Sequence, residues 1–155
     1  MTPSPRGPGR RSAARRRLLG PAILALAFAL RAWLLGAKAL WWDEALAVWA
    51  LRKPLAGLTA WTAGDVHPPL FFWLHWFWRL STGESPFALR FPSLLWGVLT
   101  VALAVALGRR AAGPAAGAWS RLLVGVAPFA VWWSQELRMY ALAGFWVALL
   151  PYAAW

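Results

Sequence analysis

Four apolar segments, each close to the length that crosses a bilayer, restrict the folds open to this chain more than any other feature. They lie at about residues 18–36, 90–107, 115–133 and 139–155. A membrane-spanning helix needs about 20 mostly apolar residues. Hydrophobic residues make up 61% of the chain and charged residues only 14%, which is unlike a soluble domain. The sequence therefore predicts an all-α fold, a transmembrane bundle whose helices span the membrane several times.

Two charged residues interrupt these segments, and each lies near a segment end. Arg31 is close to the end of the first segment and Arg121 is close to the beginning of the third. A long side chain at such a position can reach the lipid headgroups, so we expect both to do so. Small residues at 111–117 predict a tight turn between the second and third segments. The fourth segment is still apolar at Trp155, so we expect an N-terminal part of a longer protein, inactive alone.

The basic residues predict the orientation in the cell membrane. Residues 1–17 contain six Arg and no acid, and short segments rich in Lys and Arg stay in the cytoplasm. Their Pro, Gly, Ser and Arg content predicts a disordered arm. With a net charge of +11, we expect contact with anionic lipid headgroups and no binding of nucleic acid. Alternatively, residues 15–39 resemble a secretory signal with its cleavage site.

The first outer loop, residues 37–89, is long enough to have a structure of its own. It contains seven of the 14 Trp, and amphipathic indole rings favour the boundary between lipid and water. Residues 43–51 are predicted to form a short helix with acids at its beginning, and residues 68–80 a second helix that opens with prolines. We expect these helices to lie in the membrane interface.

All five acidic residues fall outside the cytoplasm in this topology, which points to polar chemistry at the outer face. Four are in the first outer loop and the fifth is in the second; they are Asp43, Glu44, Asp65, Glu84 and Glu136. The chain has no cysteine, so neither disulfides nor thiolate metal ligands are possible. Asp65 and His67 supply at most half of a metal site, so we predict no bound metal, with a divalent ion as the alternative.

Several motifs occur in a characteristic order. Trp-Trp-Asp-Glu at 41–44 follows the first apolar segment, and Asp-Val-His-Pro-Pro-Leu at 65–70 comes next. Phe-Ala-Leu-Arg-Phe-Pro-Ser at 87–93 and Ser-Gln-Glu-Leu-Arg-Met-Tyr at 134–140 complete the series. Over residues 18–155 the chain resembles the GT-C glycosyltransferases, in particular the branch with protein O-mannosyltransferases and lipid A aminoarabinose transferases.

The resemblance implies transfer of a hexosyl or pentosyl group from a polyprenyl-phosphate donor to a glycan, lipid or protein acceptor outside the cytoplasm. In that family an acid of the first outer loop is the general base, and its position here is Asp43. If this segment is helical, Glu44 points about 100° away, so we expect it to orient Asp43 or the acceptor.

The remaining site residues are predicted to bind substrate. Arg pairs well with phosphate oxygens, so Arg90 and Arg138 are expected at the carrier phosphate, with Tyr140 as a further donor. Glu136 is expected to orient Arg138, with a role as a second carboxylate near the acceptor as the alternative. Asp65 and His67 are expected beside the substrate.

Each assignment also has a purely structural interpretation. Asp43 and Glu44 could form a solvated helix start, Asp65 and His67 could cap the helix after Pro68, and the two Arg could contact lipid phosphates. A noncatalytic membrane protein, such as a carrier-lipid flippase or an assembly subunit, is therefore the alternative function. It would need the apolar segments and the Arg pair, but no base.

Overall fold

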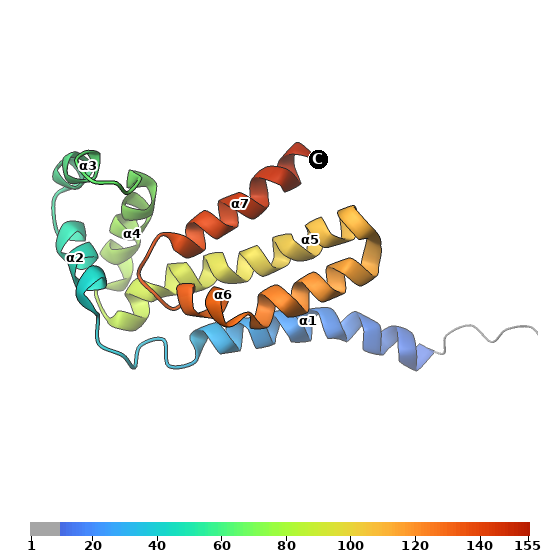
Figure 1. Cartoon of the computed structure of the whole chain (residues 1–155). Coiled ribbons are helices and arrows are strands. Elements are labelled where there is room, and N and C mark those ends of the chain that lie inside the picture. The colour runs from blue at the N-terminus through green and yellow to red at the C-terminus, as the bar shows by residue number, and fades with distance from the viewer. Residues whose placement is uncertain (1–9) are drawn as a thin grey trace, which may run out of the picture.

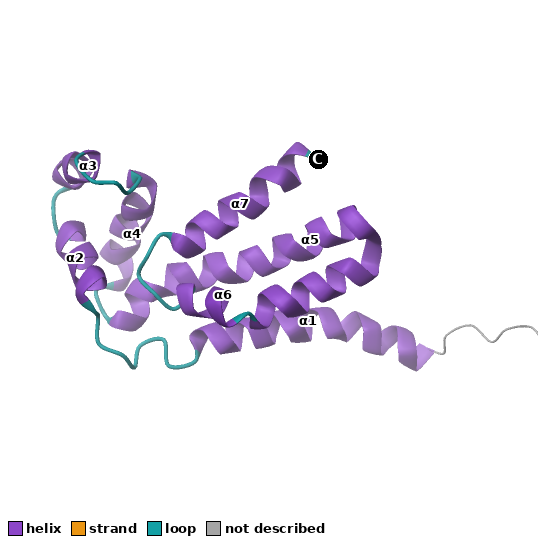
Figure 2. Ribbon diagram, viewed as in Figure 1, coloured by secondary structure: helices purple, strands orange, loops and turns teal. Residues whose placement is uncertain are grey.

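The computed structural model describes residues 10–155, and within them every regular element is a helix (Figures 1 and 2). This confirms the all-α class. In chain order the elements are α1 (Arg10–Ala32), α2 (Trp42–Leu51), α3 (Leu55–Ala63), α4 (Pro69–Thr82), α5 (Pro86–Val126), α6 (Pro128–Trp133) and α7 (Tyr140–Ala154). The long helices α1, α5 and α7 run alongside one another, and α2, α3 and α4 gather at one end (Figure 1).

Helix α1 starts earlier than the sequence analysis expected. The predicted disordered arm covered residues 1–17, of which 1–9 lie outside the described residues, whereas α1 already begins at Arg10. The segment 10–19 consists of Arg, Ala, Leu and Ser without Pro or Gly. Arg, Ala and Leu are strong helix formers, so α1 includes these basic residues, whereas the disordered cytoplasmic arm stays a prediction.

Helix α5 is a hairpin of two helical arms. Ala112 and Gly113 leave the helical region, and Gly113 has a φ of 83°, which glycine adopts without a Cβ clash. The second arm then folds back along the first (Figure 1). The predicted tight turn at 111–117 is therefore confirmed. Pro128 ends the second arm, so the predicted segment 115–133 is divided between α5 and α6.

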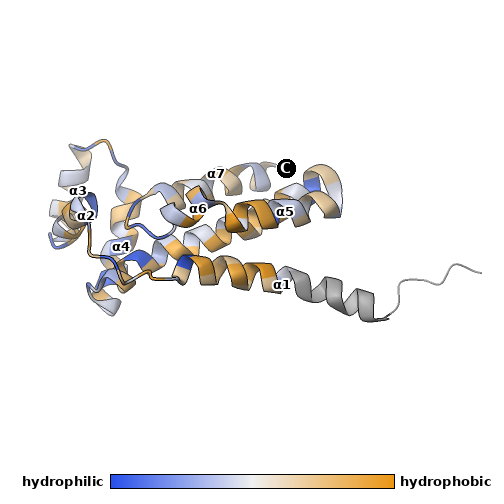
Figure 3. Cartoon of the chain, turned by 60° about the horizontal axis from the view of Figure 1, so that its bottom comes forward, coloured by the Kyte–Doolittle hydropathy of each residue, from blue (hydrophilic) through white to orange (hydrophobic). Residues whose placement is uncertain are grey.

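The helices indicate fewer membrane crossings than the four apolar segments of the sequence predict. Within residues 10–155, α5 is the one helix long and apolar enough to cross a membrane. Gly20–Ala32 of α1 and Tyr140–Ala154 of α7 are shorter apolar helices. Hydrophobic residues concentrate along α1 and α5 (Figure 3). The structure thus supports a helical bundle, whereas its multiple crossings remain a prediction.

The first outer loop has its own hydrophobic core. Helices α2 and α4 begin close to the predicted positions, and α3 was not foreseen. Their buried residues form one cluster with the start of α5, the segment before α7 and the first turn of α7. Its members are Ala47, Val48, Ala50, Leu51, Leu58, Phe71, Phe72, Leu89, Leu137 and Leu142. Because this core ties α2 to residue 137, it brings the first outer loop against the second.

The two charged residues of the apolar segments do not behave alike. Arg31 is fully buried and bonds to protein atoms, so the prediction that it reaches the headgroups is wrong. The oxygens that accept its hydrogen bonds belong to α1, to the end of α5 and to the residue after α6. Arg121 lies against Gly20 of α1, and its contact with headgroups stays a prediction.

Candidate functional site

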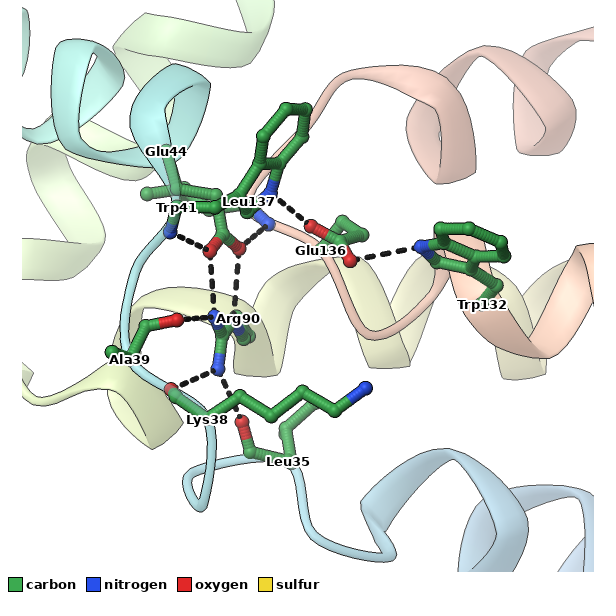
Figure 4. Close-up of polar contacts among 9 residues, drawn as sticks. All are labelled: Leu35, Lys38, Ala39, Trp41, Glu44, Arg90, Trp132, Glu136 and Leu137. Atoms are coloured by element: carbon green, nitrogen blue, oxygen red, sulfur yellow. Dashed lines mark hydrogen bonds and ion pairs between the residues drawn. The ribbon is translucent and has the colours of Figure 1, made fainter.

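A buried ion pair between Glu44 and Arg90 joins the start of α2 to the start of α5 (Figure 4). Arg90 donates from Nε to one carboxylate oxygen at 2.8 Å and from Nη2 to the other at 2.6 Å. The side chains are 0% and 4% exposed for Glu44 and Arg90. A bidentate arginine–carboxylate pair is among the stronger charge-assisted contacts, so this pair fixes α2 relative to α5.

The remaining donors of Arg90 are also occupied. Nη1 donates to the carbonyl oxygens of Leu35 and Lys38 at 2.9 Å, and Nη2 donates to that of Ala39 at 3.1 Å. A guanidinium has five N–H groups, and these five bonds use them all. In this arrangement Arg90 has no free donor for the carrier phosphate that the sequence analysis assigned to it. It instead shapes the chain between α1 and α2.

Glu44 also connects the two outer loops. One of its oxygens accepts from the Leu137 backbone N–H at 2.8 Å, and the other accepts from the Trp41 N–H at 3.3 Å. Every contact of this carboxylate is therefore to protein. Glu44 was expected to orient Asp43 or the acceptor, but its direct partners are Arg90 and two backbone amides.

Asp43 points to the other side of α2 and meets Arg138. Its Oδ2 atom lies 3.6 Å from Nη1 of Arg138. The Asp43 side chain is 37% exposed, so an acceptor can approach it, whereas that of Arg138 is 13% exposed. Arg138 also lies over the Tyr140 ring at 5.8 Å, and its buried Nε has no hydrogen-bond partner among residues 10–155. Asp43 and Arg138, predicted as base and phosphate ligand, are thus brought together from separate loops.

Asp65 and His67 form a pair close to Arg138. Nδ1 of His67 and Oδ2 of Asp65 are 2.8 Å apart. The hydrogen bond from His67 holds the pKa of Asp65 below its ordinary value, and the positive charge of Arg138 adds to the effect. Asp65 makes no cap on α4; its other bond is from the Val66 N–H. We name Asp43, Asp65, His67, Arg138 and Tyr140 the outer site.

The described side chains offer no complete metal site. Within residues 10–155 no group of three His, Asp or Glu side chains is placed to hold an ion. His67 has only Asp65 as a neighbour of this kind. The other histidine, His75, is buried in α4, and burial lowers its pKa to about 4. His75 is therefore neutral near pH 7 and lies apart from the outer site.

Glu136 interacts with two tryptophans rather than with Arg138. Trp41 and Trp132 each donate an indole N–H to one of its oxygens (Figure 4). Two adjoining pockets open beside it, and both are lined by Lys38, Arg90, Trp132 and Glu136. The sequence analysis assigned no role to Lys38, Trp41 or Trp132. The high density of Trp around the acidic motifs was the available signal, but it indicated only a position in the membrane interface.

Glu84 is the one acid outside these contacts, and it holds α4 to the end of α2. It accepts from Arg52 at 2.6 Å and from Arg79 at 2.7 Å. The hydrogen bond from Arg52, then that from Arg79 and the positive charge of both, keep the pKa of Glu84 below its ordinary value. This carboxylate therefore contributes stability in its ionised form.

Replacing Glu84 with Gln is expected to lower the unfolding midpoint at pH 6 by a few degrees, and to have a smaller effect near pH 3. A lowered folded-state pKa contributes stability that is present above the unfolded value, about 4.3 for Glu, and is lost as pH falls through the folded value. The contribution is small because Arg52 is largely exposed. Thermal unfolding in detergent at both pH values measures it. An equal difference between variant and parent at both pH values would contradict this account.

Comparison with known proteins supports the resemblance seen in the motifs. No curated protein and no solved structure gives a significant match. The family described as dolichyl-phosphate-mannose-protein mannosyltransferase matches residues 66–154, more than half of the chain. This region includes His67, Arg90, Glu136, Arg138 and Tyr140. The chain therefore belongs to the dolichyl-phosphate-mannose-protein mannosyltransferase family.

Proposed function

We propose that this protein transfers a sugar from a polyprenyl-phosphate donor to an acceptor at the outer face of the cell membrane. Family membership gives the general class, a membrane glycosyltransferase. The family's name refers to a dolichyl-phosphate-linked donor and a protein acceptor. The observation that supports the proposal most is the accessible Asp43 carboxylate beside the Arg138 guanidinium. The carboxylate can accept a proton, and the guanidinium can bind a phosphate.

The proposed step gives each of these groups one task. An acceptor hydroxyl or amine attacks the anomeric carbon, and Asp43 takes the proton that the attacking atom loses. The bond between the anomeric carbon and the phosphate oxygen breaks, and its electron pair leaves with the carrier phosphate. Arg138 stabilises that charge through its Nη1 donor, which faces Asp43 before substrate binds. Tyr140 supplies a further hydroxyl donor.

Other polar residues near Asp43 and Arg138 would hold the substrates. Asp65 and His67 lie within electrostatic reach of Arg138 and are placed to orient the acceptor. Glu136, with Lys38 and the two indoles, borders pockets in which a sugar ring can lie against aromatic faces. No resident metal or other cofactor has a part in the proposed step.

A transfer assay with two classes of donor tests this function. The complete gene product, in sealed vesicles, is expected to transfer sugar from a polyprenyl-phosphate-linked donor to a peptide acceptor. The acceptor is present only on the side of the vesicle membrane that corresponds to the outer face of the cell membrane. It is expected to use no nucleotide sugar. Transfer from a nucleotide sugar, or only when the acceptor is at the cytoplasmic face, would rule out the proposed reaction.

The topology is expected to place α2, α3 and α4 outside, with α1, the two arms of α5, and α7 as the crossings and the N-terminus in the cytoplasm. Because the described chain contains no cysteine, single cysteines can report the side. Val66→Cys, at an 89% exposed position, is expected to react with an impermeant maleimide added outside intact cells. Ala111→Cys, at the α5 turn, is expected to react only after lysis. The reverse pattern would contradict the orientation.

A further inference from the structure

Arg31 is a buried cation that no carboxylate neutralises within the described residues. Its Nε donates to Oγ of Ser134 at 3.1 Å. Nη1 donates to the carbonyl oxygens of Ala27 at 3.0 Å and Gly125 at 2.8 Å, and Nη2 to that of Val124 at 3.2 Å. A charged side chain in such surroundings is costly unless its donors are used. These contacts join α1, the end of α5 and the residue after α6.

Pro128 explains why a carbonyl at the end of α5 needs a donor from another element. In an α-helix the Val124 carbonyl would accept from the N–H four residues later, and that residue is Pro128, which has none. The carbonyls at a helix C-terminus also carry partial negative charge. Arg31 supplies both the missing donor and the positive charge. At the break that Pro128 makes between α5 and α6, a side chain from α1 therefore satisfies the carbonyls that end α5.

Ser134, the partner of Nε, is the first residue of the segment 134–139, which carries Arg138 of the outer site. The next residue, Gln135, donates from Nε2 to the carbonyls of Leu30, Arg31 and Trp33 at the end of α1. Further along, the Leu137 N–H binds Glu44 and the Arg138 side chain meets Asp43. Residues 134–139 are thus held by α1 at their beginning and by α2 at their end.

Gly97 leaves the space that the Arg31–Ser134 contact occupies. A Cβ at position 97 would lie 2.0 Å from Oγ of Ser134 and 2.9 Å from Nε of Arg31. Real Cβ contacts are not so short, so a methyl group must displace one of the two side chains. Gly144 of α7 lines the same pocket, and a Cβ there meets no atom within 4 Å. The two glycines therefore form a matched pair for experiment.

We propose that Arg31, through its contact with Ser134, is a positioning residue for the outer site: it sets where residues 134–139 place Arg138 beside Asp43. The proposal rests on the proposed function for its effect on transfer. Its geometric part concerns only the position of the segment. When a change far from the reacting atoms displaces a catalytic group by about 1 Å, the reaction rate can fall about a hundredfold.

A labelling experiment tests the geometric part without any activity. Leu137 is 0% exposed, so in a Leu137→Cys background a maleimide reacts only when the segment moves. Gly97→Ala is expected to raise the labelling rate roughly tenfold, and Gly144→Ala to leave it unchanged. Ser134→Ala, which removes the acceptor without adding volume, provides a second variant if Gly97→Ala folds poorly, and is expected to raise labelling as well. Equal labelling rates in Ser134→Ala and Gly144→Ala would overturn the proposal.

Kinetics of the complete gene product test the effect on the reaction. In Gly97→Ala and Arg31→Met, we expect kcat to fall by roughly tenfold to a hundredfold with little change in the KM for the lipid-linked sugar. Arg31→Met combined with Ser134→Ala is expected to lose no more than Arg31→Met alone, because the two residues share one contact. Additive losses, or a rise in KM with kcat unchanged, would overturn the positioning role. Inactivity of the parent protein would refute the proposed function while the labelling result still decides the contact.

Discussion

Replacing Asp43 with Asn is expected to reduce the turnover of sugar transfer by about 10²–10⁴-fold, the range that a positioned general base contributes. Asn keeps the size of the side chain but cannot accept the proton that the attacking atom loses. The outer position and partial exposure of Asp43 mean that its loss costs the fold little. Initial rates with a polyprenyl-phosphate sugar, measured for the complete gene product, give the ratio.

The control is a variant that loses the same charge at another carboxylate of the first outer loop. Glu84→Gln removes a negative charge from the first outer loop, but Glu84 contacts Arg52 and Arg79 rather than the outer site. It is expected to retain transfer within about threefold, which is less than 1 kcal/mol in the barrier. If Asp43→Asn transferred sugar as fast as Glu84→Gln, Asp43 would not be the base, and a noncatalytic role in carrier-lipid handling would be favoured.

Neighbouring acids illustrate what the sequence could and could not predict. The helical period predicts that Asp43 and Glu44 face different directions, and they do: one meets Arg138 at the surface and the other is buried. The sequence could not show which would be buried. That depends on Arg90, 46 residues further along, and on the Leu137 amide in another loop. Such long-range partners leave no periodic pattern in a single chain.

The arginines show the same limit. A basic residue at the outer end of an apolar segment can bind a phosphate, reach a headgroup or satisfy protein carbonyls, and its sequence position is identical in each case. Arg90 and Arg31 take the third role because backbone carbonyls of the α1–α2 connection and of the end of α5 lie against them, whereas Nη1 of Arg138 faces the partly exposed Asp43. The presence of helices and the turn at Gly113 were within reach of sequence patterns. The assignment of each cation required the packing.

Replacing Arg90 with Met is expected to destabilise the fold by about 3–5 kcal/mol, because it leaves the buried Glu44 carboxylate without its cation. Three carbonyls, those of Leu35, Lys38 and Ala39, lose their donors as well. Unpaired buried polar groups cost more than the hydrogen bonds themselves contribute. Chemical or thermal unfolding of the purified protein in detergent measures the loss. Arg52→Met, which breaks an exposed ion pair of the same type, is expected to have a much smaller effect, because solvent screens an exposed pair.

The double variant separates the cost of an unpaired charge from the value of the pair. Glu44→Gln alone retains one oxygen but turns an amide NH₂ toward donors that need an acceptor, so we expect it to be destabilised too. Combining Glu44→Gln with Arg90→Met removes both charges, and its total loss is expected to fall short of the sum of the single losses by about 0.5–3 kcal/mol. Strict additivity would mean that the two side chains do not depend on each other. The pair would then not be what holds the first outer loop, and Asp43 with it, against Arg138.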